Sequence, residues 1–327
     1  VRRQYDGDGR LEFLKHGPDP DTADTRITAF TYKSTGDDQN GLLDTITDAE
    51  GHVTSFSYDD AGRVLTQTFE PGTVDERVIS YDYYPNGTLK SVTPPDQPLH
   101  LFDYTQVNLE KQYVPPTVGF APDTNYQYND DRQLTDISRP DSQNVTFGYE
   151  PIGGRLQTVT IPSVTGPGAE VRTYSYDPAT GNVSGLTGPD ADLTFGYDGW
   201  LLTSEQWSDG SLTSTVNFSY DNDFRLDQVD LGTAITEISF AYDDDGLLTQ
   251  AGGLAPITRH DDYGFITDTT LGTITDAWTY SSFGELETYT ASASGIPFYE
   301  FQITERDKLG RITEKSAVSY THLTLPT

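Results

Sequence analysis

Carboxylate clusters are the residues of this sequence whose types and spacing come closest to a recognisable chemistry. Asp6 with Asp8, and Asp221 with Asp223, supply the oxygen ligands that Ca²⁺ prefers. An EF-hand loop needs an oxygen ligand at its fifth position, and counting from Asp6 that position is Arg10. The second cluster fails in the same way. The spacing therefore favours hairpin turns over calcium sites, because Asp in a turn can accept a bond from the backbone two residues on.

Other catalytic patterns are also missing from the sequence. It contains no Cys, no GxSxG, no P-loop and no strand-linked GxGxxG. With 51 acidic residues, no carboxylate pair stands out as a glycosidase pair. No two histidines stand at the i, i+4 spacing of a helical zinc motif. The five are His16, His52, His100, His260 and His322. We therefore expect no enzymatic activity, no cofactor and no metal site.

Three tryptophans leave a binding function open. Trp200 stands in a turn-like segment, and Trp207 and Trp278 lie in strand-like segments. Exposed indole rings could stack on a sugar, whereas packing on a sheet face is the more common fate of Trp. Both interpretations stay open at this point.

Composition restricts the classes of partner and fold. The net charge of -31 argues against nucleic acid and against an anionic membrane surface, which both need a basic face. No apolar run approaches the ~20 residues of a spanning helix, so we expect no membrane insertion. Aromatic residues make up 12%, with 21 Tyr, which favours strands over helices and excludes a disordered chain.

One phrase recurs along almost the whole chain, and it explains the Asp-rich turns. The stretch YDDAGRVLT begins at Tyr58, and related stretches return roughly every 23 residues, a period typical of repeat proteins. The chain departs from the phrase in places: His260 is assigned to a Tyr slot, and Leu247 replaces Arg. The fourteen copies begin at Tyr5, Tyr32, Tyr58, Tyr81, Tyr104, Tyr128, Tyr149, Tyr176, Tyr197, Tyr220, Tyr242, His260, Tyr280 and Arg306.

Residues around the phrase predict a hairpin for each copy. Before Tyr242, Ile238 and Phe240 alternate with polar residues, which is the period of two expected of a half-buried strand. After the turn, Val64-Leu65-Thr66 is a short β-prone run. A lone hairpin is marginally stable, so the copies must stack edge to edge into one long antiparallel sheet. The predicted fold is all-β, an array of stacked hairpins over residues 1–317.

The turn residues have separate structural roles. Asp caps the turn, Gly takes positive φ, and Arg pairs with Asp or lies over a Tyr ring. Asn86-Gly87 is also a strong hairpin pair. The predicted structural turn positions are Tyr5, Asp6, Gly9, Arg10, Tyr58, Asp59, Gly62, Arg63, Tyr176, Asp177, Tyr220, Asp221, Tyr242, Asp243, Gly246, Gly310 and Arg311.

The last ten residues differ from the rest of the chain. VSYTHLTLPT, residues 318–327, breaks the Asp-rich composition and matches the translation of a transposon end and adapter used in DNA library preparation. We interpret it as sequencing read-through and not as native protein. The absence of Met at Val1 further indicates a fragment of a longer chain.

The repeated phrase resembles the YD repeats of the Rhs family and the teneurins, over residues 1 to about 316. That resemblance implies a β-sheet spiralling into a hollow shell that encloses a toxic or variable C-terminal polypeptide, as in bacterial Rhs proteins and insecticidal toxin complexes. The family's DPxGxxG-like self-cleavage motif does not occur here, so no catalytic residue is carried over.

The resemblance also implies partners and a location. The first expectation is a structural, encapsulating segment of a bacterial polymorphic toxin, secreted or at the cell surface. Its partners would be an effector of the same polypeptide and secretion machinery. The second is a teneurin-like adhesion or carbohydrate-binding module that contacts cell-surface glycans. A polysaccharide-active enzyme is the third and weakest alternative, since no carboxylate pair supports it.

Overall fold

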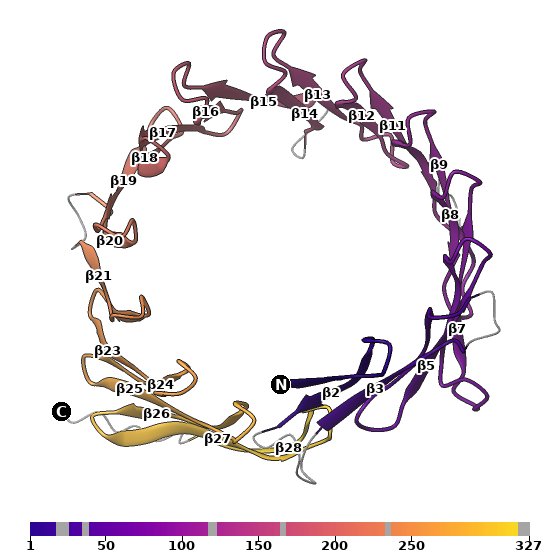
Figure 1. Cartoon of the computed structure of the whole chain (residues 1–327). Helices are drawn as coiled ribbons and strands as arrows, with labels where there is room; N and C mark the ends of the chain where they lie inside the picture. The colour runs from indigo at the N-terminus through magenta and orange to yellow at the C-terminus, as the bar shows by residue number, and fades with distance from the viewer. Residues whose placement is uncertain (18–25, 35–38, 117–122, 164–167, 233–236, 320–327) are drawn as a thin grey trace. The chain divides into compact units, whose positions relative to one another are not determined.

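The chain folds entirely into β-strands in the part that the structure describes. The structure, a computed structural model, describes residues 1–17, 26–34, 39–116, 123–163, 168–232 and 237–319. Twenty-eight strands and no helix lie within these residues (Figure 1). Each strand pairs antiparallel with the next strand along the chain wherever the two belong to the same compact unit. The all-β fold of stacked antiparallel hairpins predicted from the sequence is thereby confirmed.

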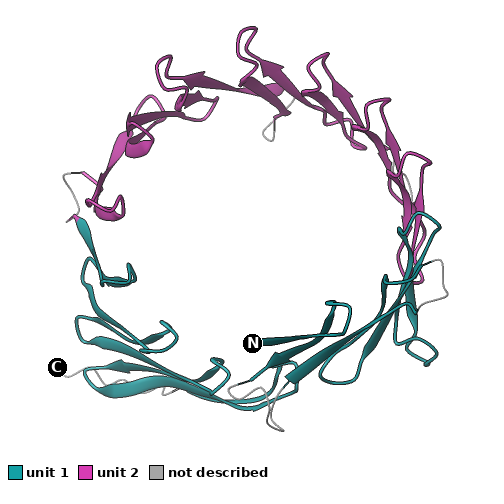
Figure 2. Ribbon diagram, viewed as in Figure 1, with its two compact units in different colours: residues 1–78, 238–327 teal, residues 79–237 magenta. Residues whose placement is uncertain are grey.

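Two compact units divide the chain, and the first combines residues 1–78 with residues 238–327 (Figure 2). Two runs of successive strands make up this unit. They are β1 (Arg2–Tyr5), β2 (Leu11–His16), β3 (Arg26–Tyr32), β4 (Leu43–Thr47), β5 (Val53–Tyr58) and β6 (Val64–Phe69), then β21 (Ile238–Tyr242), β22 (Leu248–Ala251), β23 (Leu254–Arg259), β24 (Ile266–Leu271), β25 (Ile274–Tyr280), β26 (Leu286–Ala293), β27 (Ile296–Arg306) and β28 (Ile312–Ser319).

The second unit spans residues 79–237 and is one uninterrupted run of strands. Its first strand, β7, begins two residues before the unit does. The strands are β7 (Arg77–Tyr83), β8 (Leu89–Thr93), β9 (His100–Tyr104), β10 (Glu110–Val114), β11 (Thr124–Tyr128), β12 (Leu134–Ser138), β13 (Val145–Tyr149), β14 (Leu156–Pro162), β15 (Ala169–Tyr176), β16 (Val183–Thr187), β17 (Asp192–Asp198), β18 (Leu201–Ser208), β19 (Thr213–Tyr220) and β20 (Leu226–Asp230).

Hairpins are the building unit, and in each of them the strand pairing shifts by one residue next to the turn. In β5 and β6, Phe56 lies opposite Gln67, and the pairing then shifts so that Tyr58 lies opposite Val64. The same shift occurs at Tyr176, which lies opposite Val183. A shift of this kind is a β-bulge, which leaves one extra residue on one strand and increases the local twist. The repeated phrase therefore encodes a bulged turn.

Two of the repeat positions predicted from the sequence are wrong. The fourth copy turns at Tyr83, which lies opposite Leu89, and not at Tyr81, which lies inside the ladder opposite Val92. In the twelfth copy Arg259 holds the Tyr slot opposite Ile266, so His260 is the residue after it. In both copies the alignment followed the aromatic ring, whereas the bulge fixes the register.

The sheet has little buried interior. Among the described residues only Ile257, Ala291 and Ile303 are buried apolar side chains, and Ser91 and Thr269 are buried polar ones. The accessible surface is 21081 Å², whereas a compact monomer of this mass exposes roughly 13,000 Å². Stability must therefore come from ladder hydrogen bonds, cross-strand pairs and the contacts between successive turns. Across the described residues, no helix is long and apolar enough to cross a membrane.

Candidate functional site: the repeated turn and its clasp

Most of the described turns are closed by two backbone hydrogen bonds in a shared pattern. In the YDDAGRV turn, the Asp59 N–H donates to the Arg63 carbonyl (2.9 Å) and the Gly62 N–H donates to the Asp59 carbonyl (2.9 Å). This is the bond pattern of a type I turn followed by a residue in the left-handed conformation, which forms the bulge. We number the turn residues one to five, from Asp59 to Arg63, and call Tyr58, which precedes them, the clasp residue.

Asp at turn position one ties the turn to itself. The Asp59 carboxylate accepts from the backbone N–H groups of Ala61 (3.0 Å) and Arg63 (2.9 Å), and its second oxygen accepts from Arg63 Nε (2.7 Å). The same fork joins Asp6 with Arg10 and Asp221 with Arg225, each through an Nε–Oδ2 distance of 2.8 Å. One carboxylate thus satisfies backbone donors and a guanidinium together, which is a strong arrangement because the bonds are charge-assisted.

These bonds favour the ionised carboxylate. Donation by the Arg63 side chain, followed by the backbone N–H of Arg63, holds the pKa of Asp59 below its usual 3.8. In the turn of Asp221 the backbone N–H of Arg225 is the largest cause of the lowered pKa. Asp177 has no Arg at position five, and its pKa is lowered chiefly by the backbone N–H of Thr180. The depressed pKa values therefore come from backbone donors of the turn and, where an Arg is present, from its guanidinium as well.

The clasp residue connects one hairpin to the one before it. The Tyr58 hydroxyl donates to the Leu43 carbonyl at the start of the preceding hairpin's second strand (2.7 Å). The same bond recurs through the array. It joins Tyr32 to Leu11, Tyr128 to Glu110, Tyr149 to Leu134, Tyr176 to Leu156, Tyr220 to Leu202 and Tyr280 to Ile266.

Arginine replaces the clasp tyrosine twice and makes an equivalent bond. Arg259 donates through Nη2 to the Leu248 carbonyl (3.1 Å), and Arg306 through Nη2 to the Leu286 carbonyl (2.8 Å). A long side chain with a terminal donor is therefore what the slot requires. Sequence reasoning missed this role for Arg259, because the twelfth turn, His260 to Phe265, is one residue longer than the five-residue pattern and the Gly264 spacing points to His260 instead.

The last residue of the turn, which is position five in a five-residue turn and position six in the longer turns 150–155 and 260–265, can cover the clasp residue of the next hairpin. Arg10 Cζ lies 4.7 Å from the centroid of the Tyr32 ring, and Arg155 Cζ lies 4.3 Å from that of Tyr176. In the twelfth copy Phe265 stacks on Tyr280 instead, with centroids 5.2 Å apart. Successive turns thus pack as a continuous row, in which a cation–π contact adds to the hydroxyl bond.

Position four of the turn takes positive φ in every copy with the five-residue pattern. The φ angle is +76° at Gly62 and +83° at Gly310, and Gly9 and Gly246 are similar. Non-glycine residues take the same conformation at Asn108, Arg132 and Phe224. Asn86, which precedes Gly87, does not have positive φ, so the Asn-Gly pair belongs to this bulged turn and not to a two-residue turn.

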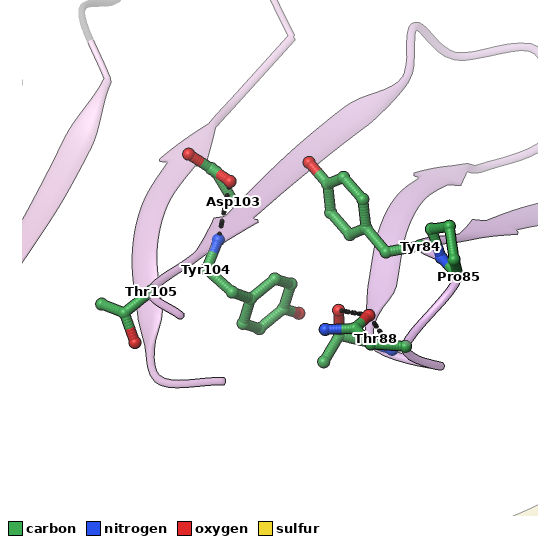
Figure 3. A pocket seen from close by; sticks show the side chains of 7 residues that line it. Tyr84, Pro85, Thr88, Asp103, Tyr104 and Thr105 are labelled. Atoms are coloured by element: carbon green, nitrogen blue, oxygen red, sulfur yellow. Dashed lines mark hydrogen bonds between the residues drawn. The ribbon is translucent and has the colours of Figure 1, made fainter. Parts of the chain in front are cut away.

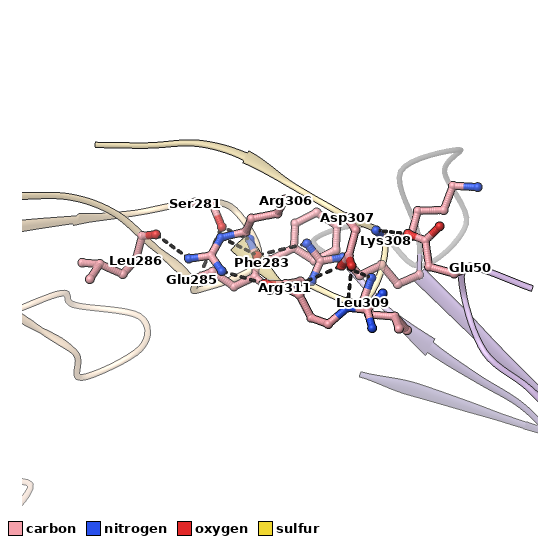
Figure 4. Close-up of polar contacts among 12 residues, drawn as sticks. Glu50, Ser281, Phe283, Glu285, Leu286, Arg306, Asp307, Lys308, Leu309 and Arg311 are labelled. Atoms are coloured by element: carbon pink, nitrogen blue, oxygen red, sulfur yellow. Dashed lines mark hydrogen bonds and ion pairs between the residues drawn. The ribbon is translucent and has the colours of Figure 1, made fainter. Parts of the chain in front are cut away.

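Within the first unit, turns from the two distant segments contact each other (Figure 4). Arg26, at the start of β3, binds Glu285 with both ends of its guanidinium, at 2.5 and 3.0 Å. The guanidinium also lies over the Phe283 ring, 4.2 Å from its centroid, and His16 meets that ring edge-on. Arg306 Nε adds a contact to Glu285 at 3.5 Å. Donation by Arg26 is the largest cause of the lowered pKa of Glu285.

A second contact joins the same two segments. The backbone N–H of Lys308 donates to the Glu50 carboxylate, in the turn between β4 and β5. Gly310 lies against the ion pair so closely that a Cβ there would meet Glu285 Oε1 at 2.3 Å and Arg26 Nη1 at 2.7 Å. These contacts span more than 250 residues of sequence (|i−j| 259 for Arg26 and Glu285), and no sequence pattern indicated them.

The remaining candidate residues are spread over the sheet. Trp200 is 82% exposed at a turn, whereas Trp278 is half-buried against Tyr289, with ring centroids 5.3 Å apart. Searching the described residues finds no group of three or more His, Asp or Glu placed to hold a metal ion. In the tail, residues 318–327, Val318 belongs to β28 and pairs with Glu300 of β27. Residues 320–327 lie outside the described residues. The tail's non-native origin stays a prediction.

Comparison with known proteins agrees with this row of clasped hairpins. The family model of the teneurin YD-shell matches residues 4–324. The chain belongs to the teneurin YD-shell family. A curated relative, the tRNA nuclease WapA of Bacillus subtilis (strain 168), is 25% identical over 122 residues, which cover 37% of this chain and 4% of WapA.

Solved structures of YD-shell proteins show the same fold. The crystal structure of TcdB2-TccC3 superposes with a TM-score of 0.73 at 12% identity, covering 97% of this chain and 20% of that one. The Photorhabdus luminescens Tc holotoxin pore superposes with a TM-score of 0.58 at 14% identity and the same coverage. This YD-shell chain thus spans about one fifth of the length of its structural neighbours.

Proposed function

We propose that this YD-shell chain is a structural segment of the wall of a β-shell that encloses an effector of the same polypeptide. The observation that carries the proposal is the single-layer sheet of clasped hairpins with almost no buried interior. A sheet without a second layer leaves both faces accessible, and a shell wall uses one face for solvent and the other for a content. Its role is mechanical and not catalytic.

The contacts between turns suit a wall. Within each unit, successive hairpins are joined by ladder bonds along the strands, and at most of the described turns a clasp bond joins them as well. Because most contacts of a repeat are with its neighbours, we expect loss of one clasp bond to weaken the wall locally and to leave the remaining repeats in place. The family resemblance supports the further proposal of a product that bacterial secretion machinery exports from the cell.

Protease protection in the complete polypeptide tests the proposal. We expect any segment inside the shell to resist proteolysis until the wall is opened by denaturant, and electron microscopy to show a cavity. Tyr58→Phe combined with Tyr176→Phe removes two clasp bonds and should lower the denaturant concentration at which the segment is cleaved. A solid rod or a flat sheet by electron microscopy would contradict the proposal.

Trp200 favours one alternative function, an adhesion module that binds cell-surface glycans. Its ring is 82% exposed at the tip of the β17–β18 hairpin, where a sugar could stack on it. A glycan array compares the unmodified chain with Trp200→Ala and with the matched control Phe224→Ala, which removes another exposed turn aromatic, 72% accessible. Loss of binding in the Trp200 variant alone would favour adhesion, and absence of any binding would remove this alternative.

A further inference from the structure

One turn in the second unit lacks the side chain that covers the next clasp residue. In the β7–β8 turn, position five is Thr88. Its carbonyl accepts from the Tyr84 N–H (2.9 Å), as the Arg63 carbonyl accepts from the Asp59 N–H. The next clasp residue is Tyr104, at the end of β9. Thr88 is too short to reach over a neighbouring ring as Arg10 and Arg155 do.

The place of the missing guanidinium is an open hollow between two hairpins. Its volume is ≈ 270 Å³, below the size of a pocket for a drug-sized ligand. Figure 3 shows the Tyr104 ring directed toward Thr88 across it. The hollow is lined by Tyr84, Pro85, Asn86, Thr88, Asp103, Tyr104 and Thr105.

Two aromatic rings form the walls of this hollow. Tyr84 occupies turn position one, where Asp or Glu stands in the turns that end in Arg. Its ring meets that of Tyr104 edge-on, with centroids 6.3 Å apart and planes at 89°. The Tyr84 hydroxyl donates to the Phe102 carbonyl (3.1 Å). Within the described part of the chain, the Tyr104 hydroxyl has no hydrogen-bond partner, unlike the clasp tyrosines on either side of the array. The hollow therefore offers a ring face and a free hydroxyl.

The electrostatics of the hollow favour a cation. Asp103 contributes a carboxylate to the lining, 43% exposed and paired with Lys111 only at 3.3 Å. Aromatic faces attract cations, and a guanidinium, being planar and weakly hydrated, stacks on them best among protein side chains. A chain with a net charge of -31 attracts cations generally, and this turn combines an unfilled position five with a pair of rings.

We propose that this hollow binds the guanidinium of an arginine side chain supplied by another polypeptide segment. The incoming guanidinium takes the position over Tyr104 that the chain's own arginines take over Tyr32 and Tyr176. Because Thr88 does not cover Tyr104, the position that an internal arginine takes in other turns is open to an arginine from outside. The inference does not depend on whether the sheet encloses an effector.

Calorimetric titration at low ionic strength tests the site with two probes, the free ethylguanidinium ion and the blocked peptide acetyl-Gly-Arg-Gly-amide. We expect saturable binding of the peptide with a dissociation constant on the order of millimolar, as one cation–π contact beside a carboxylate gives. The peptide should bind more tightly than ethylguanidinium, because its backbone can contact the rim. Equal affinities would overturn the assignment to a polypeptide segment and leave a site for free cations.

Variants separate this site from general attraction to an acidic protein. Thr88→Arg places an internal guanidinium over Tyr104 and should weaken peptide binding by about tenfold or more. The matched control Gln133→Arg adds the same charge at position five of another turn, where Gln133 already bonds the Gly154 carbonyl (2.6 Å), and should leave binding unchanged. Far-UV circular dichroism verifies the fold of both. Peptide binding that is absent in the unmodified chain, or unchanged by Thr88→Arg, would overturn the proposal.

Discussion

At the scale of single residues, turn position four carries backbone strain that differs from copy to copy. Glycine adopts positive φ at little cost, whereas an L-residue with a side chain pays for the left-handed conformation through its Cβ. Phe224 has φ +61° and is 72% exposed, so its ring gains little from burial in return. The turn keeps its shape there because the ladder on both sides fixes the register.

Phe224→Gly is therefore expected to stabilise the chain. Relief of the left-handed strain outweighs the added flexibility of glycine, for a net gain of about 0.5–1 kcal/mol in the free energy of unfolding. Urea unfolding monitored by circular dichroism measures the change as a higher midpoint. Gly62→Ala is the reverse control: its Cβ would lie 3.7 Å from Leu42 Cδ1, without a clash, so the conformational cost alone should lower stability by about 1 kcal/mol. A lower midpoint for Phe224→Gly would contradict the strain argument.

At the scale of the hairpin, the clasp and the Asp turn make the phrase a connector as well as a turn. The hydroxyl of the clasp residue reaches back to the preceding hairpin, and the carboxylate at position one holds the bulge closed. Both act on backbone groups, so they work in copies whose other residues vary. This explains why Arg can replace Tyr in the clasp, and why Thr180 can replace Arg as the donor to Asp177.

Tyr58→Phe tests the clasp bond. The substitution removes the hydroxyl and leaves the Leu43 carbonyl without that donor, so we expect a loss of about 0.5–1.5 kcal/mol in unfolding free energy. Tyr197→Phe is the matched control, since the Tyr197 hydroxyl has no hydrogen bond within the described residues, and it should be near neutral. Native-state hydrogen exchange at β4 and β5 should show the weakening locally. Equal effects of the two substitutions would count against the clasp.

Acid should weaken the Asp turns. Folding lowers the pKa values of Asp6, Asp59 and Asp221 below 3.8, so the unfolded chain takes up protons first as the pH falls. The stabilisation is complete above 3.8 and is lost as the pH falls through that value toward the lower pKa values of the folded state. Urea midpoints measured between about pH 5 and about pH 3 should therefore decline.

Salt and a variant isolate this acid effect. Protonation also relieves repulsion within a chain of net charge -31, which opposes the decline, and high salt screens that repulsion. At high salt, Asp59→Asn combined with Asp221→Asn should show a smaller decline than the unmodified chain, because two of the titrating turn carboxylates are gone. An identical decline in both proteins would contradict the assignment to the turns.

At the scale of the whole molecule, the contact between residues 1–78 and 238–327 is what makes them one unit. Arg26 and Glu285 form a two-bond ion pair whose side chains are only 16% and 21% exposed. Phe283 lies under the guanidinium, and Gly310 leaves the room that the pair occupies.

A double-mutant cycle measures the coupling across this contact. Arg26→Ala and Glu285→Ala, singly and together, should give a coupling free energy of about 1 kcal/mol, since the pair is bidentate and shielded from solvent. The control cycle uses Arg139 and Asp141, a pair 2.9 Å apart but 47% and 48% exposed, for which about 0–0.5 kcal/mol is expected. Coupling at Arg26 and Glu285 no larger than in the control would show that the contact does not hold the unit together.

Sequence patterns alone predicted the strand rhythm, the Asp-Gly turn and the fold class, whereas the bulge at each turn was seen only in the strand pairing. These features are local: alternation over a few residues sets the faces of a strand, and Asp, Gly and Arg at fixed spacing set the turn. The two misplaced copies, at Tyr81 and His260, show the limit of that reading. An aromatic residue was used to locate each copy in the sequence, but the strand register determines which residue occupies the clasp position.

Only the tertiary structure decided which turns meet. The clasp joins residues about one repeat apart, the ion pair of Arg26 with Glu285 joins residues at opposite parts of the sequence, and the hollow over Tyr104 arises because Thr88 leaves a place unfilled. Such contacts depend on how the hairpins stack and twist, and a sequence period of about 23 residues does not predict them. Local residue preferences set the strands and turns of each repeat, and the stacking of the repeats sets which side chains contact one another.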